Sequence, residues 1–209
     1  MMSGAVSPLR ESPVFIDMLT MLFDMNMQTQ APTTEIIRGE RLLNGAIRRM
    51  YASRNFYPDA NSTMRLSFGT VCGYTPFDGA EYDYYTTTKG VLEKVKAHVG
   101  DVDFAVQPEL VSLLSSRNFG RYADEKGEMK VCFISNNDIT GGNSGSAMFN
   151  SKGELLGLAF DGNWEAMGSD ILYEPKMQRT IGVDVRYILF MIEKYGKAGN
   201  LIKELNIIN

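Results

Sequence analysis

The chain has 209 residues, of which 44% are hydrophobic and 22% charged, and its formal net charge is −4. This composition is that of a globular protein with one large domain, or one domain and an attachment. The slightly acidic balance, with no block of like charges, argues against a nucleic-acid partner. No stretch is long and apolar enough to cross a bilayer, and the N-terminus, which Glu11, Asp17 and Asp24 interrupt, lacks the pattern of a signal peptide.

The first quarter of the chain has the pattern of helices. Pro13 suits a first helical position and precedes the run VFIDMLTMLFDM. A second helix is expected from Thr33 or Thr34 to Met50, because apolar residues recur there at helical spacing. We therefore predict a helical segment over residues 1–52 and a domain boundary near residue 53.

Short strands and turns follow this boundary. The alternation of Met64, Leu66 and Phe68 predicts a strand, and GVLEKVKAHVG predicts a short helix that ends near Gly100. Further strands are expected at KVCFIS, SAMFN, ELLGLAF and RTIGVDV. The turn NSKGE joins the middle two into a hairpin, in which Gly153 supplies a positive φ.

The C-terminal part is expected to be helical. Asp184 can cap the run VRYILFMIEKY, Gly196 can stop it, and NLIKELN adds a turn or two. The sequence thus predicts a mainly β fold with helical attachments, in which residues 53–209 form a β-barrel half with a closing helix. A parallel α/β sheet is the alternative, which is disfavoured because helices do not separate the strands.

Metal and cofactor sites are not expected. Cys72 and Cys132 lie in separate strand-like runs, match no metal motif, and are better explained as buried free thiols than as a disulfide. The chain holds one histidine, His98, so a zinc site is disfavoured.

The loop NNDITGGNSGSAMFN presents one serine, Ser144, between glycines. Acyl transfer builds negative charge on a carbonyl oxygen, and one backbone N–H aimed at that oxygen typically contributes about 2.7–4 kcal/mol. In the chymotrypsin-like arrangement the two donors are the serine N–H and that of the glycine two residues earlier, here Gly142. The pattern favours a nucleophile loop, although a hairpin loop with a surface serine can have the same sequence pattern.

The strand after this loop ends at Asp161 and Gly162. In chymotrypsin-like barrels the corresponding strand lines the primary specificity pocket. Glycine would leave such a pocket open, and a carboxylate could bind a substrate ammonium group. A simple β-turn is the other interpretation of the letters DGN.

These linked motifs resemble one family. The run from TGGNSGSAMFN through FDGNWE to GVDVRYILFMIEKYG is similar to the C-terminal part of the bacterial dipeptidyl-peptidase 7 and 11 family, and FYPDANSTMRLSFGTVCGY resembles its re-entry from a helical insertion into the second barrel. The family consists of serine exopeptidases with a chymotrypsin-like double barrel. Ala147 departs from the family pattern, which has proline there.

The resemblance implies a role for each site residue. Ser144 matches the nucleophile, and Asp161 matches the carboxylate that helps to hold the free α-amino group of the substrate. Gly162 matches a position that is arginine, as in FDRNWE, in the acid-preferring branch, so glycine implies an apolar residue at the second substrate position. The resemblance also implies a periplasmic or cell-surface location and a peptide as the substrate.

The resemblance leaves Ser144 without a base in this chain. The catalytic histidine and aspartate of the family lie in the first barrel, and His98 does not match that motif. We therefore expect an N-terminal barrel, in cis or in trans, to supply them, and the 209 residues alone to fold, to associate through an exposed face and to show little peptidase activity. Two alternatives remain open: a non-catalytic peptide-binding or interaction module, and a divergent glutamyl-endopeptidase-like enzyme that uses His98.

Overall fold

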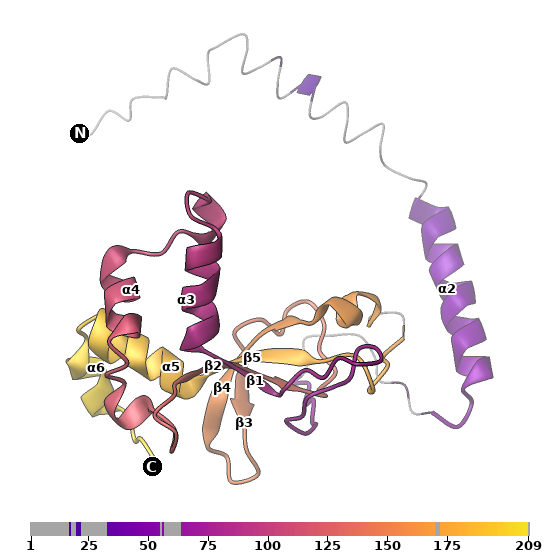
Figure 1. Ribbon diagram of the computed structural model, residues 1–209. Helices are drawn as coiled ribbons and strands as arrows, with labels where there is room; N and C mark the ends of the chain where they lie inside the picture. The colour runs from indigo at the N-terminus through magenta and orange to yellow at the C-terminus, as the bar shows by residue number, and fades with distance from the viewer. Residues whose placement is uncertain are drawn as a thin grey trace, which may run out of the picture. The chain divides into compact units, whose positions relative to one another are not determined.

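Figure 1 shows the computed structural model of the chain. The structure describes residues 33–54, 56, 64–169 and 172–208, together with positions 17, 20 and 21. The chain divides into two compact units, residues 1–63 and 64–209. This division falls C-terminal to the boundary near residue 53 that the sequence predicted, which stays a prediction. The helix expected after Pro13 falls almost entirely outside the described residues.

The first unit contains α2 (Thr33–Met50), which confirms the second predicted helix. Its first turn carries Glu35 and its last turn carries Arg48 and Arg49, an order that suits the helix dipole. The apolar stripe that predicted the helix is exposed, with fractions between 48% and 73% for Ile36, Ile37, Leu42, Leu43 and Met50.

The second unit is built on one five-stranded sheet with the order β1-β2-β5-β4-β3. The strands are β1 (Tyr85–Thr87), β2 (Lys130–Ser135), β3 (Ala147–Phe149), β4 (Leu155–Gly162) and β5 (Thr180–Asp184). Every pairing between them is antiparallel, so the parallel-sheet alternative is wrong. The four strands predicted after residue 130 and the hairpin between β3 and β4 are confirmed, and Gly153 has the expected positive φ of 79°.

Close packing across the sheet depends on Gly182 in the middle of β5. A Cβ at this position would lie 2.8 Å from the Phe133 ring and 2.7 Å from the Met148 sulfur. Glycine therefore lets these two side chains cross the strand.

The strand predicted over residues 64–70 is wrong. This segment lies along the end of β2, where the Asn136 N–H donates to the Thr70 carbonyl, but it forms only a single bridge, between Val71 and Ser135. Met64, Leu66 and Phe68 are 94%, 84% and 88% exposed. Alternation specifies a strand when its apolar face is buried, but here the apolar face is exposed and the contacts are made by the other side, where Ser67 Oγ donates to the Asp138 carbonyl at 2.7 Å.

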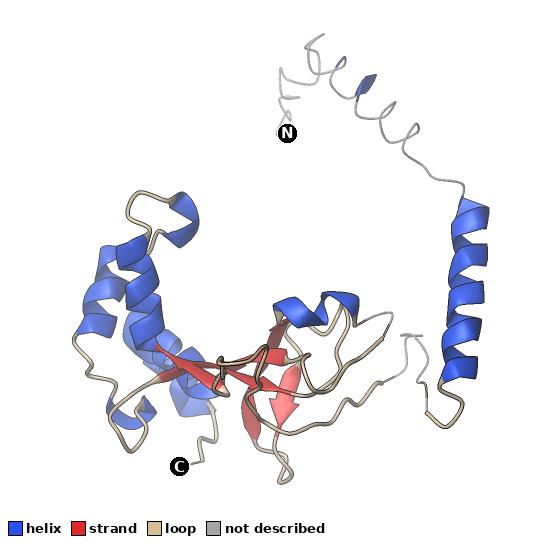
Figure 2. Cartoon of the chain, turned by 45° about the vertical axis from the view of Figure 1, so that its right-hand side comes forward, coloured by secondary structure: helices blue, strands red, loops and turns tan. Residues whose placement is uncertain are grey.

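Helices gather at one end of the sheet, as Figures 1 and 2 both show. They are α3 (Thr88–Ala97), α4 (Pro108–Ser115), α5 (Val185–Phe190), continued by the π-helical turn η5 (Met191–Tyr195), and α6 (Gly199–Glu204). The expected cap of α5 is present, because the Asp184 carboxylate accepts from the Arg186 N–H at 2.9 Å. The helices predicted at 90–100, 185–195 and 200–206 are confirmed, whereas α4 was not predicted.

The hydrophobic core lies among these helices. It is formed by Leu110, Leu114, Phe119, Tyr122, Met129, Leu189, Phe190 and Ile202. The second unit is therefore an antiparallel sheet with helical attachments, and its helices make it mixed rather than mainly β. The closed barrel and the double-barrel arrangement remain predictions.

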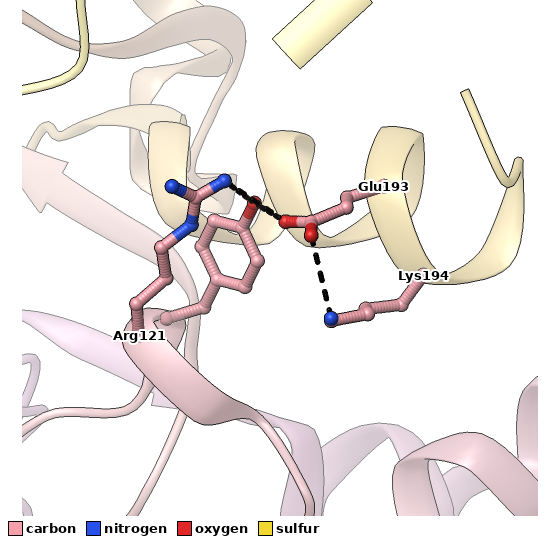
Figure 3. Close-up of polar contacts among 4 residues, drawn as sticks. Arg121, Glu193 and Lys194 are labelled. Carbon is pink, nitrogen blue, oxygen red and sulfur yellow. Dashed lines mark hydrogen bonds and ion pairs between the residues drawn. The ribbon is translucent and has the colours of Figure 1, made fainter. Parts of the chain in front are cut away.

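A polar cluster joins the three-residue turn η3 (Gly120–Tyr122) to η5 at the edge of this core (Figure 3). The Glu193 carboxylate accepts from the Tyr122 hydroxyl, from Arg121 Nη2 at 3.0 Å and from Lys194 Nζ at 3.3 Å. The Tyr122 hydrogen bond is the main reason why the pKa of Glu193 falls from 4.5 to about 2.

Candidate active site

Ser144 lies in the loop between β2 and β3 and is exposed. The loop is attached to β4, because the Gly145 N–H donates to the Ala159 carbonyl at 2.7 Å and the Ala159 N–H donates to the Ser146 carbonyl at 2.8 Å. Gly142 and Gly145 have φ values of 101° and 82°, which residues with a Cβ rarely adopt. The glycines that flank Ser144 are therefore required by the backbone path.

The N–H groups of this loop fall into two classes. The Asn143 N–H donates to the Thr140 carbonyl at 3.2 Å, and the Ser146 N–H donates to the Asn143 carbonyl at 2.9 Å. The N–H groups of Gly142 and Ser144 have no acceptor in the described part of the chain. They are the two donors that the sequence predicted for an oxyanion, and both are available to a ligand.

The Ser144 hydroxyl contacts the backbone of β4: Oγ donates a hydrogen bond to the Phe160 carbonyl oxygen at 3.2 Å. Phe160 is the extra residue of a β-bulge, since Ala159 pairs with Gly182 while Asp161 pairs with Ile181. Bulges re-aim the groups of a strand and recur beside active sites. A carbonyl accepts a hydrogen bond but is not a general base, so this contact orients Ser144 without activating it.

His98 does not lie beside Ser144. It is the C-cap residue of α3, and its ring stacks on Phe104 with a centroid separation of 4.0 Å. Helix α3 begins directly after β1, at the sheet edge opposite β3, and leads away from the sheet (Figures 1 and 2). Its ten residues carry His98 about 15 Å along that direction. The contacts of His98 are those of the predicted helix-end residue and offer no support for a catalytic role.

Asp161 and Gly162 are the last two residues of β4 and directly follow Phe160, whose carbonyl Ser144 contacts. Asp161 is exposed, and its Oδ1 accepts from the Gly162 N–H at 2.8 Å. A Cβ at Gly162 would lie 2.9 Å from the Ala166 Cβ, in the turn η4 (Trp164–Gly168). An arginine at this position would thus require η4 to shift.

A hydrogen-bond network behind these residues was not predicted. The Tyr74 hydroxyl donates to Glu165 Oε2 at 3.0 Å, and Asn163 Nδ2 donates to the same oxygen at 2.8 Å. Arg179, which is 6% exposed, donates to the Gly73 carbonyl across 106 residues of sequence. Carbonyl acceptors carry no sequence signature, and only the unusual burial of an arginine marks the network.

Exposed apolar side chains occur at and just after the β4 position that Ser144 contacts. Phe160, Trp164 and Met167 are 60%, 84% and 78% exposed. A cavity of about 460 Å³ lies elsewhere, between α3 and α4, and no residue of the 138–168 stretch lines it.

The cysteines and the acidic side chains of the described residues do not extend the site around Ser144. Cys72 and Cys132 are free and half-buried rather than fully buried, and burial raises the pKa of Cys132. Among the residues that the structure describes, no group of three histidine, cysteine or acidic side chains is arranged to hold a metal ion. Within the same described ranges, no helix is both long and apolar enough to span a membrane.

Comparison with curated proteins shows close relatives. Dipeptidyl-peptidase 7 of Porphyromonas gingivalis is 54% identical over 173 residues, which are 83% of this chain and 24% of the relative. Dipeptidyl-peptidase 7 of Porphyromonas endodontalis is 53% identical over 186 residues, and an Asp/Glu-specific dipeptidyl-peptidase of Porphyromonas gingivalis is 43% identical over 173 residues. The chain spans about a quarter of the length of these relatives.

The fold is also similar to solved structures. The crystal structure of Porphyromonas endodontalis DPP11 in complex with the dipeptide Arg-Glu matches with a TM-score of 0.69 and 42% identity, covering 77% of this chain and 23% of that one. The family model of peptidase S46 matches residues 9–207. These matches confirm the resemblance that the serine loop and the strand after it had indicated, and the chain belongs to the peptidase S46 family.

Proposed function

We propose that this chain is the C-terminal portion of a serine-type dipeptidyl aminopeptidase in which Ser144 is the nucleophile. The observation that carries the proposal is the conjunction at one site of an exposed Ser144 hydroxyl, two unpaired N–H donors at Gly142 and Ser144, and the Asp161 carboxylate at the end of the adjoining strand. The names of the relatives agree with it.

The proposed reaction proceeds by acyl transfer. A general base removes the Ser144 proton while Oγ attacks the second peptide carbonyl of the substrate, and the two N–H groups stabilise the oxyanion that forms. The C–N bond then breaks, the leaving amine takes the proton from the base, and water hydrolyses the acyl-enzyme to release a dipeptide. Asp161 binds the substrate ammonium, so that cleavage occurs two residues from a free N-terminus.

The proposal includes a partner barrel, in cis or in trans, that supplies the base. The exposure of Phe160, Trp164 and Met167 supports it, because large exposed apolar side chains are typical of a surface that another surface covers. The row Met64, Leu66 and Phe68 is exposed in the same way. A periplasmic or cell-surface location belongs to the same proposal.

A chimera tests the nucleophile. Residues 64–209 of this chain would replace the matching segment of the P. gingivalis dipeptidyl-peptidase 7, and the product would be assayed for dipeptide release and fluorophosphonate labelling. Ser144→Ala should lower turnover by about 10⁶ and abolish labelling. Ser146→Ala is the matched control, because this nearby serine uses only its backbone in the loop contacts, and it should leave both readouts unchanged.

The same assay on the 209 residues alone separates the alternatives. Slow labelling of Ser144 without turnover is expected if the base lies outside this chain. Rapid, Ser144-dependent turnover by the chain alone would show that it holds its own base. An inactive chimera that still binds peptides would favour the non-catalytic binding module instead, which the lack of any base in contact with Ser144 among the described residues also favours.

We further propose an apolar preference at the second substrate residue. Gly162 brings no charge to this position, and the two Porphyromonas dipeptidyl-peptidase 7 relatives are more similar to the chain than the Asp/Glu-specific relative, at 54% and 53% against 43%. In the chimera, Gly162→Arg combined with Ala166→Gly should shift preference towards Asp and Glu, because guanidinium binds carboxylate in two-pronged fashion. The second change removes the Cβ that an arginine would meet at 2.9 Å. Ala166→Gly alone is the control, and an unchanged substrate ratio in the double variant would contradict the assignment.

A further inference from the structure

The segment that carries Asp161 and Gly162 is tied to Arg179 through the next residue, Asn163. The Asn163 N–H donates to the Arg179 carbonyl at 2.9 Å, and the Arg179 N–H donates to Asn163 Oδ1 at 2.8 Å. Asn163 Nδ2 also donates to the Met177 carbonyl at 2.9 Å. A single side chain thus joins the end of β4 to the loop that leads into β5.

The Arg179 guanidinium is buried in a cage of carbonyl groups. Nη2 donates to the Gly73 carbonyl at 2.9 Å, and Nη1 donates to the Pro175 and Gln178 carbonyls at 2.8 Å each. No carboxylate pairs with it in the described part of the chain. Because a buried charge is costly unless its donors are satisfied, this cage indicates that the surrounding loops are organised around Arg179.

Tyr74 completes a second connection from Arg179 to the same segment. The guanidinium lies over the Tyr74 ring, 5.3 Å from its centroid, and the Tyr74 hydroxyl donates to Glu165 at 3.0 Å. Glu165 accepts in turn from Asn163 Nδ2 at 2.8 Å. Arg179 therefore supports the segment on both sides of Trp164, through its backbone at Asn163 and through its guanidinium and Tyr74 at Glu165.

We propose that Arg179 is a positioning residue, which fixes the direction of Asp161 and of the Phe160 carbonyl in two ways: its guanidinium organises the loop whose backbone binds Asn163, and it supports Glu165 through Tyr74. A charged recognition group must be held within about 0.5 Å of its productive place, and residues at the end of a strand need such support. The kinetic consequence rests on the proposed function, whereas the tether itself does not.

Hydrogen exchange on the 209-residue chain tests the tether without any need for activity. In Arg179→Met, amides of residues 161–168 should exchange about tenfold faster, while amides of α4 in the helical core keep their rates. Arg186→Met is the matched control, because Arg186 lies just beyond the other end of β5 and pairs with Asp184 at 2.6 Å. It should leave residues 161–168 unchanged.

Two further, more conservative variants keep the test decisive if Arg179→Met does not fold. Arg179→Lys keeps the charge but lacks the planar fork, so it should not restore slow exchange. Tyr74→Phe keeps the ring and removes only the hydroxyl, so it should accelerate residues 161–168 about threefold. Unchanged exchange of this segment in all three variants, or equal acceleration in α4, would overturn the proposal.

The chimera adds a kinetic readout. If Arg179 positions the amino-group site, Arg179→Lys should raise KM for dipeptidyl substrates about tenfold, with a smaller change in kcat. A role in folding alone would lower the apparent kcat through loss of active enzyme and leave KM unchanged, which would count against the proposal. A chimera that is inactive with Arg179 intact would refute the proposed function, and hydrogen exchange would still decide whether Arg179 holds the segment.

Discussion

The two ends of the second unit are held together in different ways. At the helical end, Leu114, Met129 and Phe190 are 0% exposed and form an apolar core. At the serine end, Phe160, Trp164 and Met167 are at least 60% exposed, and the buried side chains include the polar residues Gln178, Arg179 and Thr180. Apolar burial therefore supplies stability at one end, whereas hydrogen bonds to carbonyl groups define the shape of the other.

The backbone differs in the same sense. At the serine end, the left-handed positions 142 and 145 are glycines. At the helical end, left-handed glycines such as Gly120 are joined by Arg117 and Lys197, which both have a φ of 54° although each carries a Cβ. The serine loop is thus relaxed in its unusual conformation, and the helical end tolerates strain because its core is well buried.

The largest effect should come from the apolar core. Phe190→Ala removes a fully buried ring that meets Phe119 edge-on at 5.7 Å, and it should lower the free energy of unfolding by about 3–5 kcal/mol in urea denaturation. Phe160→Ala is the control at the serine end and should change it by less than about 0.5 kcal/mol. Similar losses for the two variants would erase the contrast between the ends.

Asp161→Ala should leave stability almost unchanged but weaken substrate binding. The side chain is exposed and its one described partner is the adjacent Gly162 N–H, so the free energy of unfolding should change by less than about 0.5 kcal/mol. In the chimera, the loss of its ammonium partner should weaken transition-state binding of substrates with a free N-terminus by about 2–5 kcal/mol. The comparison is kcat/KM on free and N-acetylated peptides, and an equal loss on both would remove Asp161 from the amino-group site.

The features that the sequence could predict are those that depend on local signals. The hairpin of β3 and β4 depends on local signals, such as Gly153, and was predicted. The serine loop was predicted because Gly142 and Gly145 are needed for positive φ. Helix α4 was overlooked, although Pro108 at its first position and Glu109 in its first turn are ordinary start signals.

The remaining features depend on contacts that sequence patterns do not encode. The alternation of Met64, Leu66 and Phe68 predicted a strand, but that pattern needs a surface to cover one face. The bulge at Phe160 arises from the register between β4 and β5. The Arg179 cage joins residues 106 positions apart through backbone carbonyls, which every residue possesses.

Glu193 should give the next largest effect, because it links the core to the surface of the helical end. Glu193→Gln weakens the contacts with Tyr122 and Arg121 and should lower the free energy of unfolding by about 1–2 kcal/mol near pH 7. Glu93→Gln is the control, since the Lys89–Glu93 pair is 3.7 Å apart and well exposed, and it should cost less than about 0.5 kcal/mol.

The pH dependence of this effect has a defined sign. The folded-state pKa of Glu193, about 2, lies below the ordinary value of 4.5. The stabilisation is therefore complete above about pH 4.5 and is lost as the pH falls towards 2. Urea denaturation at pH 7 and pH 3 should show a smaller difference between the parent chain and Glu193→Gln at pH 3, and a constant difference would contradict the assigned contacts.

The smallest effect should be a gain at the helical end. Arg117 follows the C-cap residue Ser116 of α4, and its N–H donates to the Leu114 carbonyl with φ at 54°, where helices usually place glycine. Arg117→Gly should relieve the Cβ strain and, after the larger loss of chain entropy, raise the free energy of unfolding by about 0.5–1 kcal/mol. Arg117→Ala retains the Cβ and should bring no such gain. Since a change of 1 kcal/mol moves the melting temperature of a chain of this size by about 2–4 °C, calorimetry on the three proteins can resolve it. Equal melting temperatures for the alanine and glycine variants would mean that the arginine conformation is not strained, and that the two ends treat left-handed residues alike.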